Sequence, residues 1–185
     1  MLVSVYAQGV KGSIGVNYGT EADNLPPPSK VARFLLDSTV IRRVRVFDAD
    51  QEKLRAFAGT GIAITITIPN HQIPHLTNLT FAQEWVKDIL LPHTHSTNIV
   101  RVLVGNEVLS TANKLLISNL VPAMQTLHDA LTGELLDCDI KISTPHSLGI
   151  LSNLAPPLWG SLGRAMMLTY LNLSSTFLKP QTPLL

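Results

Sequence analysis

Strand-like and helix-like segments alternate along most of this chain, and that alternation limits its fold more than any other feature. The clearest strand signal is the β-branched run I-A-I-T-I-T-I at residues 62–68. Shorter strands are predicted at residues 13–17, 44–47, 99–104 and 140–143, with helical patterns between them. Such βα units indicate an α/β fold, a parallel sheet with helices outside. A doubly wound sheet and a (β/α)8 barrel both fit this pattern.

Capping and stop signals predict where the helices begin and end. Ser29 is expected to cap the first helix and Asp50 the second. A third helix should start at Thr80, and a later helical stretch that reaches residue 131 should break near Pro122. The sequence therefore predicts a helix in each connection between consecutive strands.

Composition excludes several classes of protein. The chain has 185 residues, of which 45% are hydrophobic and 15% charged, so it should form a sizeable core rather than a disordered segment. A net charge of +1 without a basic block predicts no nucleic-acid partner. No apolar run approaches the roughly 18 residues of a membrane span. No glycine-rich phosphate loop opens a helix, so no cofactor is expected. Cys138, the only cysteine, forms no internal disulfide and is expected to be a buried structural residue.

The first residues and two glycosylation sequons suggest secretion. Residues 1–8 resemble the end of a signal peptide, with Val5 and Ala7 placed as a cleavage site requires. Asn78 and Asn172 each begin an N-x-[ST] triplet. These features predict a secreted, extracellular protein associated with the cell wall.

The strand expected at residues 99–104 ends in Gly105-Asn106-Glu107, and this ending carries the strongest chemical signal. A strand buried on both faces has no structural reason to finish on an amide and a carboxylate. Catalytic residues of a parallel β/α barrel lie at this carboxyl-terminal mouth. Glu107 is therefore the candidate general acid. The alternative, that Asn106 and Glu107 only cap the turn into the next helix, stays open on this motif alone.

Several strings in the same order resemble one family, the plant endo-1,3-β-glucosidases of glycoside hydrolase family 17. They cover roughly residues 9–157 and read I-G-V-N-Y-G, D-N-L-P-P-P, V-R-V-F-D-A-D, A-F-A-G-T-G-I, V-G-N-E-V, L-V-P-A-M and S-T-P-H-S-L-G-I-L. The resemblance implies a (β/α)8 barrel that hydrolyses internal β-1,3-glucosidic bonds of glucans with retention. Since such a barrel usually needs about 250 residues, about five βα units are expected here.

The resemblance also implies roles for individual residues. Glu107 matches the family's general acid/base, whose proton must be held by burial or by a nearby anionic nucleophile. Asn106 matches an asparagine that binds a sugar hydroxyl, and Tyr18 a tyrosine that lines the cleft. Asp48 follows the second strand and either orients its neighbours or only forms a turn. His146 follows the fifth strand and either faces substrate or is a buried, hydrogen-bonded histidine.

One part of the family pattern is absent. The family's nucleophile is a second glutamate in an E-T-G-W-P-like string, which this sequence lacks. The remaining glutamates, Glu21, Glu52, Glu84 and Glu134, are not credible replacements. Residues 158–185 are interpreted as a divergent tail. The isolated chain is thus expected to be inactive, and the alternatives are a non-catalytic β-glucan-binding half-barrel or the product of a truncated gene model.

A metal site is a third hypothesis. His93 and His95 form an H-x-H pair, but zinc needs three or four converging ligands. Both are expected to be solvated residues of a loop at the amino-terminal face of the barrel. The sequence therefore predicts no metal.

Overall fold

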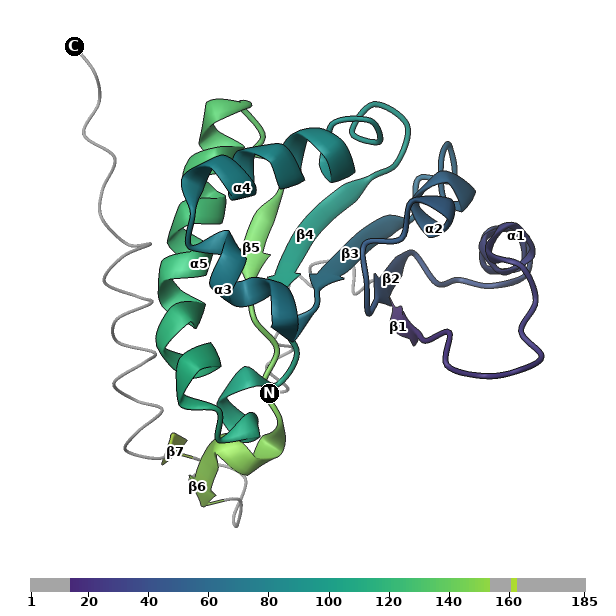
Figure 1. Ribbon diagram of the computed structural model, residues 1–185. Helices are drawn as coiled ribbons and strands as arrows, with labels where there is room; N and C mark the ends of the chain where they lie inside the picture. Colours follow the sequence, from purple (N-terminus) through teal and green to yellow (C-terminus); the bar gives the residue numbers. More distant parts are fainter. Residues whose placement is uncertain (1–13, 154–160, 163–185) are drawn as a thin grey trace, which may run out of the picture.

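The computed structural model describes residues 14–153 and 161–162. Its centre is a parallel sheet of β1 (Gly15–Tyr18), β2 (Arg43–Val46), β3 (Ala63–Ile68), β4 (Ile99–Val104) and β5 (Lys141–Ser143) (Figure 1). The strands lie in the order β1-β2-β3-β4-β5, so each pairs with the next along the chain. A doubly wound sheet would reverse its strand order at a switch point. The described sheet has no reversal and therefore follows the winding of a β/α barrel.

Helices fill the connections between strands, as predicted. They are α1 (Pro28–Ser38), α2 (Gln51–Ala56), η1 (Asn70–Gln72), α3 (Ile73–Leu76), α4 (Leu79–Trp85), η2 (Val86–Leu90), η3 (Val108–Thr111), α5 (Lys114–Gly133) and η4 (Leu148–Ile150). An antiparallel pair, β6 (Leu151–Asn153) with β7 (Ser161–Leu162), follows. Figure 1 shows α3, α4 and α5 packed together beside β4 and β5.

The two faces of the sheet differ sharply in chemistry. Alternate residues of β2, β3 and β4 are buried in the core, among them Val44, Ile66 and Val102. The other face carries a row of polar residues, one from each strand, and each is the register partner of the next. They are Asn17, Arg45, Thr65, Arg101 and Lys141. Because successive side chains of a strand point to opposite faces, one register produces both surfaces. In a closed barrel the polar row would face the interior.

The helix caps differ in part from the predicted ones. Asp50 caps α2 and accepts a 2.9 Å hydrogen bond from the Lys53 backbone N–H, which confirms that prediction. The predicted cap at Ser29 is wrong, since Pro27 occupies the cap and Pro28 the first helical position. Proline is favoured there because the first helical N–H groups have no partner inside the helix.

The predicted break at Pro122 is also wrong, because α5 runs continuously from Lys114 to Gly133. A proline inside a helix loses a hydrogen bond and crowds the preceding turn. Pro122 lies on the exposed side of the helix, while its neighbours Leu120 and Ala123 are fully buried. Burial of this apolar side holds the helix together across the proline.

His93 is buried, so the prediction of a solvated loop histidine is wrong. Its Nε2 has no hydrogen-bond partner among the described residues. Burial lowers the pKa of the imidazole, and the positive charge of Arg55 lowers it further. The folded state therefore favours neutral His93, and the unfolded chain takes up the proton first as pH falls.

The stability of the protein should consequently fall on acidification. The contribution of His93 is complete above its unfolded pKa of about 6.5 and declines as pH drops from there toward the lower folded pKa. Urea unfolding of the wild type and of His93→Leu between pH 7.5 and pH 5 measures this. The wild type should lose stability relative to the variant as pH falls, and parallel pH profiles would contradict the assignment.

Candidate active site

The turn after β4 is built around a glycine that no other residue can replace without strain. Gly105 has φ +72°, and a Cβ there would lie 2.4 Å from Val108 Cγ2 and 2.8 Å from Ile73 Cδ1. Its N–H donates to the Ile68 carbonyl at 2.9 Å, which ties the turn to the end of β3. The turn therefore leaves the strand at one defined angle and carries Asn106 and Glu107 with it.

Asn70 holds the backbone of Asn106 from both sides. The Asn106 N–H donates to Asn70 Oδ1 at 2.6 Å, and Asn70 Nδ2 donates to the Asn106 carbonyl at 3.1 Å. Sequence reasoning missed Asn70, although it follows Pro69 directly after β3. The rule that singled out polar residues at strand ends would have found it.

Glu107 adopts the left-handed conformation, with φ +49° and ψ +35°. Only glycine, asparagine and aspartate visit this region routinely, so the backbone here is strained. Glu107 makes no side-chain cap on η3, and Asn113 caps α5 instead. Glu107 therefore occupies the cap position of η3 through its backbone, whose carbonyl accepts from the Ser110 N–H at 2.9 Å, and its side chain takes no part in the cap. Its side chain is exposed in the described structure.

Arg45 lies next to this turn, and sequence reasoning missed it. From β2 it reaches past β3, and its Nη2 donates to Asn106 Oδ1 at 2.6 Å. Its guanidinium carbon stands 4.5 Å from the centre of the Phe47 ring. Burial lowers the pKa of Arg45, and the negative charge of Glu107 acts in the opposite direction. The two opposite charges are therefore close enough to interact.

Asp48 binds Lys53 rather than the turn after β4. The Lys53 ammonium donates to Asp48 Oδ2 at 2.5 Å and to Thr20 Oγ1 at 2.7 Å. Asp48 Oδ1 also accepts from the Asp50 N–H at 3.2 Å. Both alternatives for Asp48 thus have a structural basis, since it forms a turn and orients a lysine.

Tyr18 lies in the hydrophobic core at the end of β1, in register with Val46. Its ring meets Phe57 edge-on, with 6.5 Å between the ring centres. Its hydroxyl is buried and has no hydrogen-bond partner among the described residues. Burial raises the pKa of Tyr18, which the nearby Lys53 charge partly offsets. Contact between Tyr18 and a sugar stays a prediction.

His146 is exposed, so the expectation of a buried, hydrogen-bonded histidine is wrong. Partial loss of hydration still lowers the pKa of its imidazole. The adjacent Ser147 hydroxyl lies 2.7 Å from the Ser110 hydroxyl, which joins the loop after β5 to η3. His146 thus lies at the same end of the sheet as the turn that bears Glu107, where the strands finish.

Other candidate sites are less developed in the residues that the structure describes. No three His, Cys, Asp or Glu side chains converge there as metal ligands. Cys138 is exposed, contrary to the expected burial. Asn78 is exposed and caps α4 through its side chain. Within the described chain no helix is long and apolar enough to cross a membrane.

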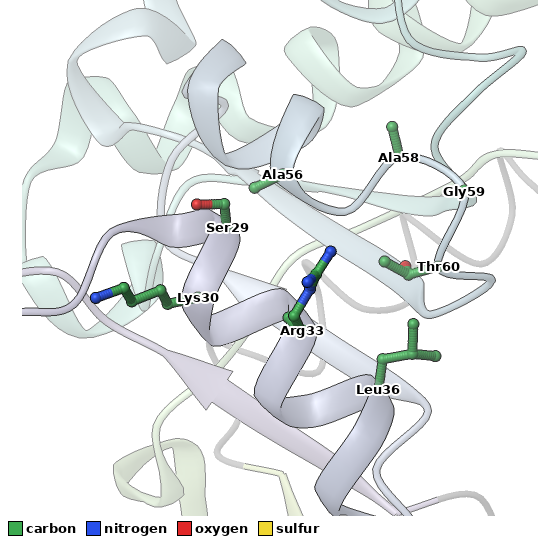
Figure 2. Close-up of a pocket in the computed structure, with 8 residues that line it drawn as sticks. All are labelled: Ser29, Lys30, Arg33, Leu36, Ala56, Ala58, Gly59 and Thr60. Carbon is green, nitrogen blue, oxygen red and sulfur yellow. The ribbon is translucent and has the colours of Figure 1, made fainter.

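A hollow of about 630 Å³ lies between α1 and the segment that follows α2 (Figure 2). Arg33 extends toward this segment, whereas Lys30 points away from it. The lining residues are Ser29, Lys30, Arg33, Leu36, Ala56, Ala58, Gly59 and Thr60. Several of them precede β3, at the end of the sheet opposite Glu107. The hollow is therefore separate from the candidate active site.

Comparison with known families assigns the chain to one of them. A family model described as glycosyl hydrolases family 17 matches residues 14–185. The chain belongs to this family. The match confirms the resemblance carried by the ordered strings, and it includes residues 158–185, which the sequence alone had set apart.

Individual relatives of this family 17 chain agree with that assignment. It is 42% identical over 161 residues to a glucan endo-1,3-beta-glucosidase of Triticum aestivum. The matched stretch covers 82% of this chain and 35% of the relative. Identity is 38% over 176 residues with glucan endo-1,3-beta-glucosidase 10 of Arabidopsis thaliana, covering 95% and 41% respectively. The chain thus spans about two fifths or less of the length of these curated relatives.

Solved structures agree with the fold. CJP38, a beta-1,3-glucanase and allergen of Cryptomeria japonica pollen, superposes with a TM-score of 0.83 at 32% identity, over 89% of this chain and 52% of that one. A structure from a study of two plant beta-glucan endohydrolases gives 0.74 at 36% identity, over 81% and 47%. The predicted barrel-family fold, with about five βα units in the described part, is confirmed.

Proposed function

We propose that this chain forms the acid/base side of a cleft that hydrolyses internal β-1,3-glucosidic bonds, with Glu107 as the general acid/base. The observation that carries the proposal is the turn after β4. Three neighbouring residues hold Asn106 and Glu107 at the carboxyl end of the strands. They are Gly105, Asn70 and Arg45. Strained backbone held by its surroundings is typical of functional sites. The names of the family relatives support β-1,3-glucan as the substrate.

Glu107 would donate its proton to the glycosidic oxygen as the bond to the leaving sugar breaks. In a retaining enzyme a second carboxylate, about 5 Å away, attacks the anomeric carbon from the other side. Water then replaces that carboxylate, with Glu107 accepting the proton of the water. Asn106 would bind a hydroxyl of the sugar at the reacting carbon.

Among the residues that the structure describes, no carboxylate is in contact with Glu107, and the exposed Glu21 lies in the loop after β1. Asp48 is engaged by Lys53, Glu52 is in α2, Glu84 is in α4, and Glu134 pairs with Lys87. A nucleophile is therefore not among the groups that surround Glu107. For this reason we expect the 185-residue chain by itself to bind β-1,3-glucan without turning it over.

Two assays on the purified chain test this proposal. Titration with linear β-1,3-linked gluco-oligosaccharides should show saturable binding, whereas β-1,4-linked oligomers of equal length should bind more weakly. Incubation with a linear β-1,3-glucan should release no reducing ends above background. Equal binding of the two linkages, or no binding of either, would refute the substrate assignment. Steady release of reducing ends that Glu107→Gln abolishes would show that the chain holds a complete catalytic pair.

A further inference from the structure

The Asn106 side chain is held in one orientation, although it lies on the surface. Asn70 fixes the Asn106 backbone through two hydrogen bonds, so only the two side-chain torsions remain free. Arg45 Nη2 then forms a 2.6 Å hydrogen bond with one end of the carboxamide. An exposed asparagine with three such contacts has lost most of its conformational freedom before any ligand arrives, which lowers the entropic cost of binding.

The chemistry of arginine decides which end of the carboxamide faces it. A guanidinium has five N–H donors and no acceptor. The atom next to Arg45 must therefore be the Asn106 oxygen, and the opposite assignment would place donor against donor. The Asn106 NH₂ group consequently points away from Arg45. It makes no hydrogen bond with any residue that the structure describes, and Asn106 is exposed.

Arg45 is itself supported. Its guanidinium lies over the Phe47 ring, and its Nε is buried without a partner among the described residues. The planar group can stack on the ring and donate in its own plane at the same time, which a lysine cannot do. The negative charge of Glu107, one residue beyond Asn106, also acts on Arg45 and raises its pKa against the effect of burial. A single side chain thus hydrogen-bonds Asn106 and interacts electrostatically with Glu107, without an ion pair in contact.

We propose that Arg45 is a positioning residue that turns the Asn106 carboxamide, so that its NH₂ group is the donor offered to an acceptor oxygen of the glucan. This inference rests on the proposed function for its ligand. Its geometric part, the direction of the carboxamide, does not depend on that function. Arg45 therefore acts through Asn106 and need not touch the sugar.

Two substitutions separate donor from acceptor. Asn106→Asp keeps an oxygen for Arg45 and replaces the NH₂ donor by a second carboxylate oxygen, which also adds one negative charge. It should weaken the binding of a β-1,3-linked gluco-oligosaccharide by about two- to tenfold, the value of one net hydrogen bond. Arg45→Met frees the carboxamide to rotate and should weaken binding over about the same range. The double variant should bind no more weakly than Asn106→Asp alone, because both changes remove the same donor.

Arg101→Met is the matched control. Arg101 lies in the same polar row, in register with Thr65 beside Arg45, and makes no hydrogen bond to the residues that the structure describes. Its removal changes the charge of the same face by the same amount and leaves Asn106 untouched. Binding by Arg101→Met should stay within about twofold of the wild type. An equal loss in both arginine variants would mean that Arg45 acts only as a charge, which overturns the proposal.

An NMR measurement on the unliganded chain keeps the inference independent of sugar binding. A coupling across the hydrogen bond between Arg45 Nη2 and Asn106 Cγ should be present in the wild type and absent in Arg45→Met. Its absence in the wild type overturns the proposal, as does oligosaccharide binding by Asn106→Asp that equals or exceeds the wild type. If the coupling is present but no oligosaccharide binds, the orientation stands and the proposed function fails.

Discussion

Replacing Gly105 by alanine is expected to lower the free energy of unfolding by about 2–5 kcal/mol. Two costs add at this position. The left-handed backbone at φ +72° costs an alanine roughly 1–2 kcal/mol. The new Cβ would also lie 2.4 Å from Val108 Cγ2, 2.8 Å from Ile73 Cδ1 and 2.9 Å from Asn70 Oδ1. Overpacking of this kind costs about 1–3 kcal/mol more.

Gly59→Ala is the matched control for that experiment. Gly59 has nearly the same backbone angle, φ +69°, but a Cβ there would meet nothing within 4 Å. It should therefore lose only the backbone contribution, about 1–2 kcal/mol. Urea unfolding followed by circular dichroism measures both variants. Equal losses in the two would contradict the close packing around the turn after β4.

Neutralising Asp48 is expected to lower the free energy of unfolding by about 1–3 kcal/mol, which is reduced from the 3–5 kcal/mol of a fully buried pair. Lys53 is buried, whereas the Asp48 side chain is 39% exposed, so solvent screens part of the attraction. Asp48→Asn keeps an oxygen that can accept from the Asp50 N–H and removes only the charge. The Lys53 ammonium then keeps Thr20 as its partner but has no counter-charge in contact.

Two further variants test the cause of that loss. Adding Lys53→Met to Asp48→Asn should recover much of the stability, because it removes the buried charge. Glu134→Gln disrupts the Lys87–Glu134 pair, which is 3.8 Å long and more exposed, and should change stability by less than about 1 kcal/mol. The three variants are compared by urea unfolding at pH 7. A loss in Glu134→Gln as large as that in Asp48→Asn would mean that burial of Lys53 is not the cause.

The strands, and the place of Glu107 just after one of them, could be predicted because each depends on neighbours in the sequence. The β-branched run at residues 99–104 matches β4 residue for residue. Alternation between strand-like and helix-like segments was enough to predict a parallel sheet. The sequence also placed Glu107 just after the fourth strand, and in the structure it follows the carboxyl end of β4. Side-chain periodicity and strand ends are local properties, so a sequence read alone carries them.

Failures of prediction arose where distant residues meet. Pro122 reads as a helix break, yet burial of Leu120 and Ala123 keeps α5 continuous. His93 reads as a solvated loop residue, yet the fold buries it. Burial depends on which elements pack together, and local propensity is only a weak guide to it.

The sequence by itself determined the class of fold, the strand that ends in Glu107 and the family resemblance. The pattern of strands and helices left open a doubly wound or a singly wound sheet, and the resemblance only implied the latter; the tertiary structure showed the strand order, because that order is a matter of pairing between segments. The tertiary structure alone revealed how the turn is held. Arg45 and Asn106 are 61 positions apart, and Asn70 and Asn106 are 36 apart. Hydrogen bonds over such separations need the parallel strands to lie side by side, with their carboxyl ends together at one end of the sheet.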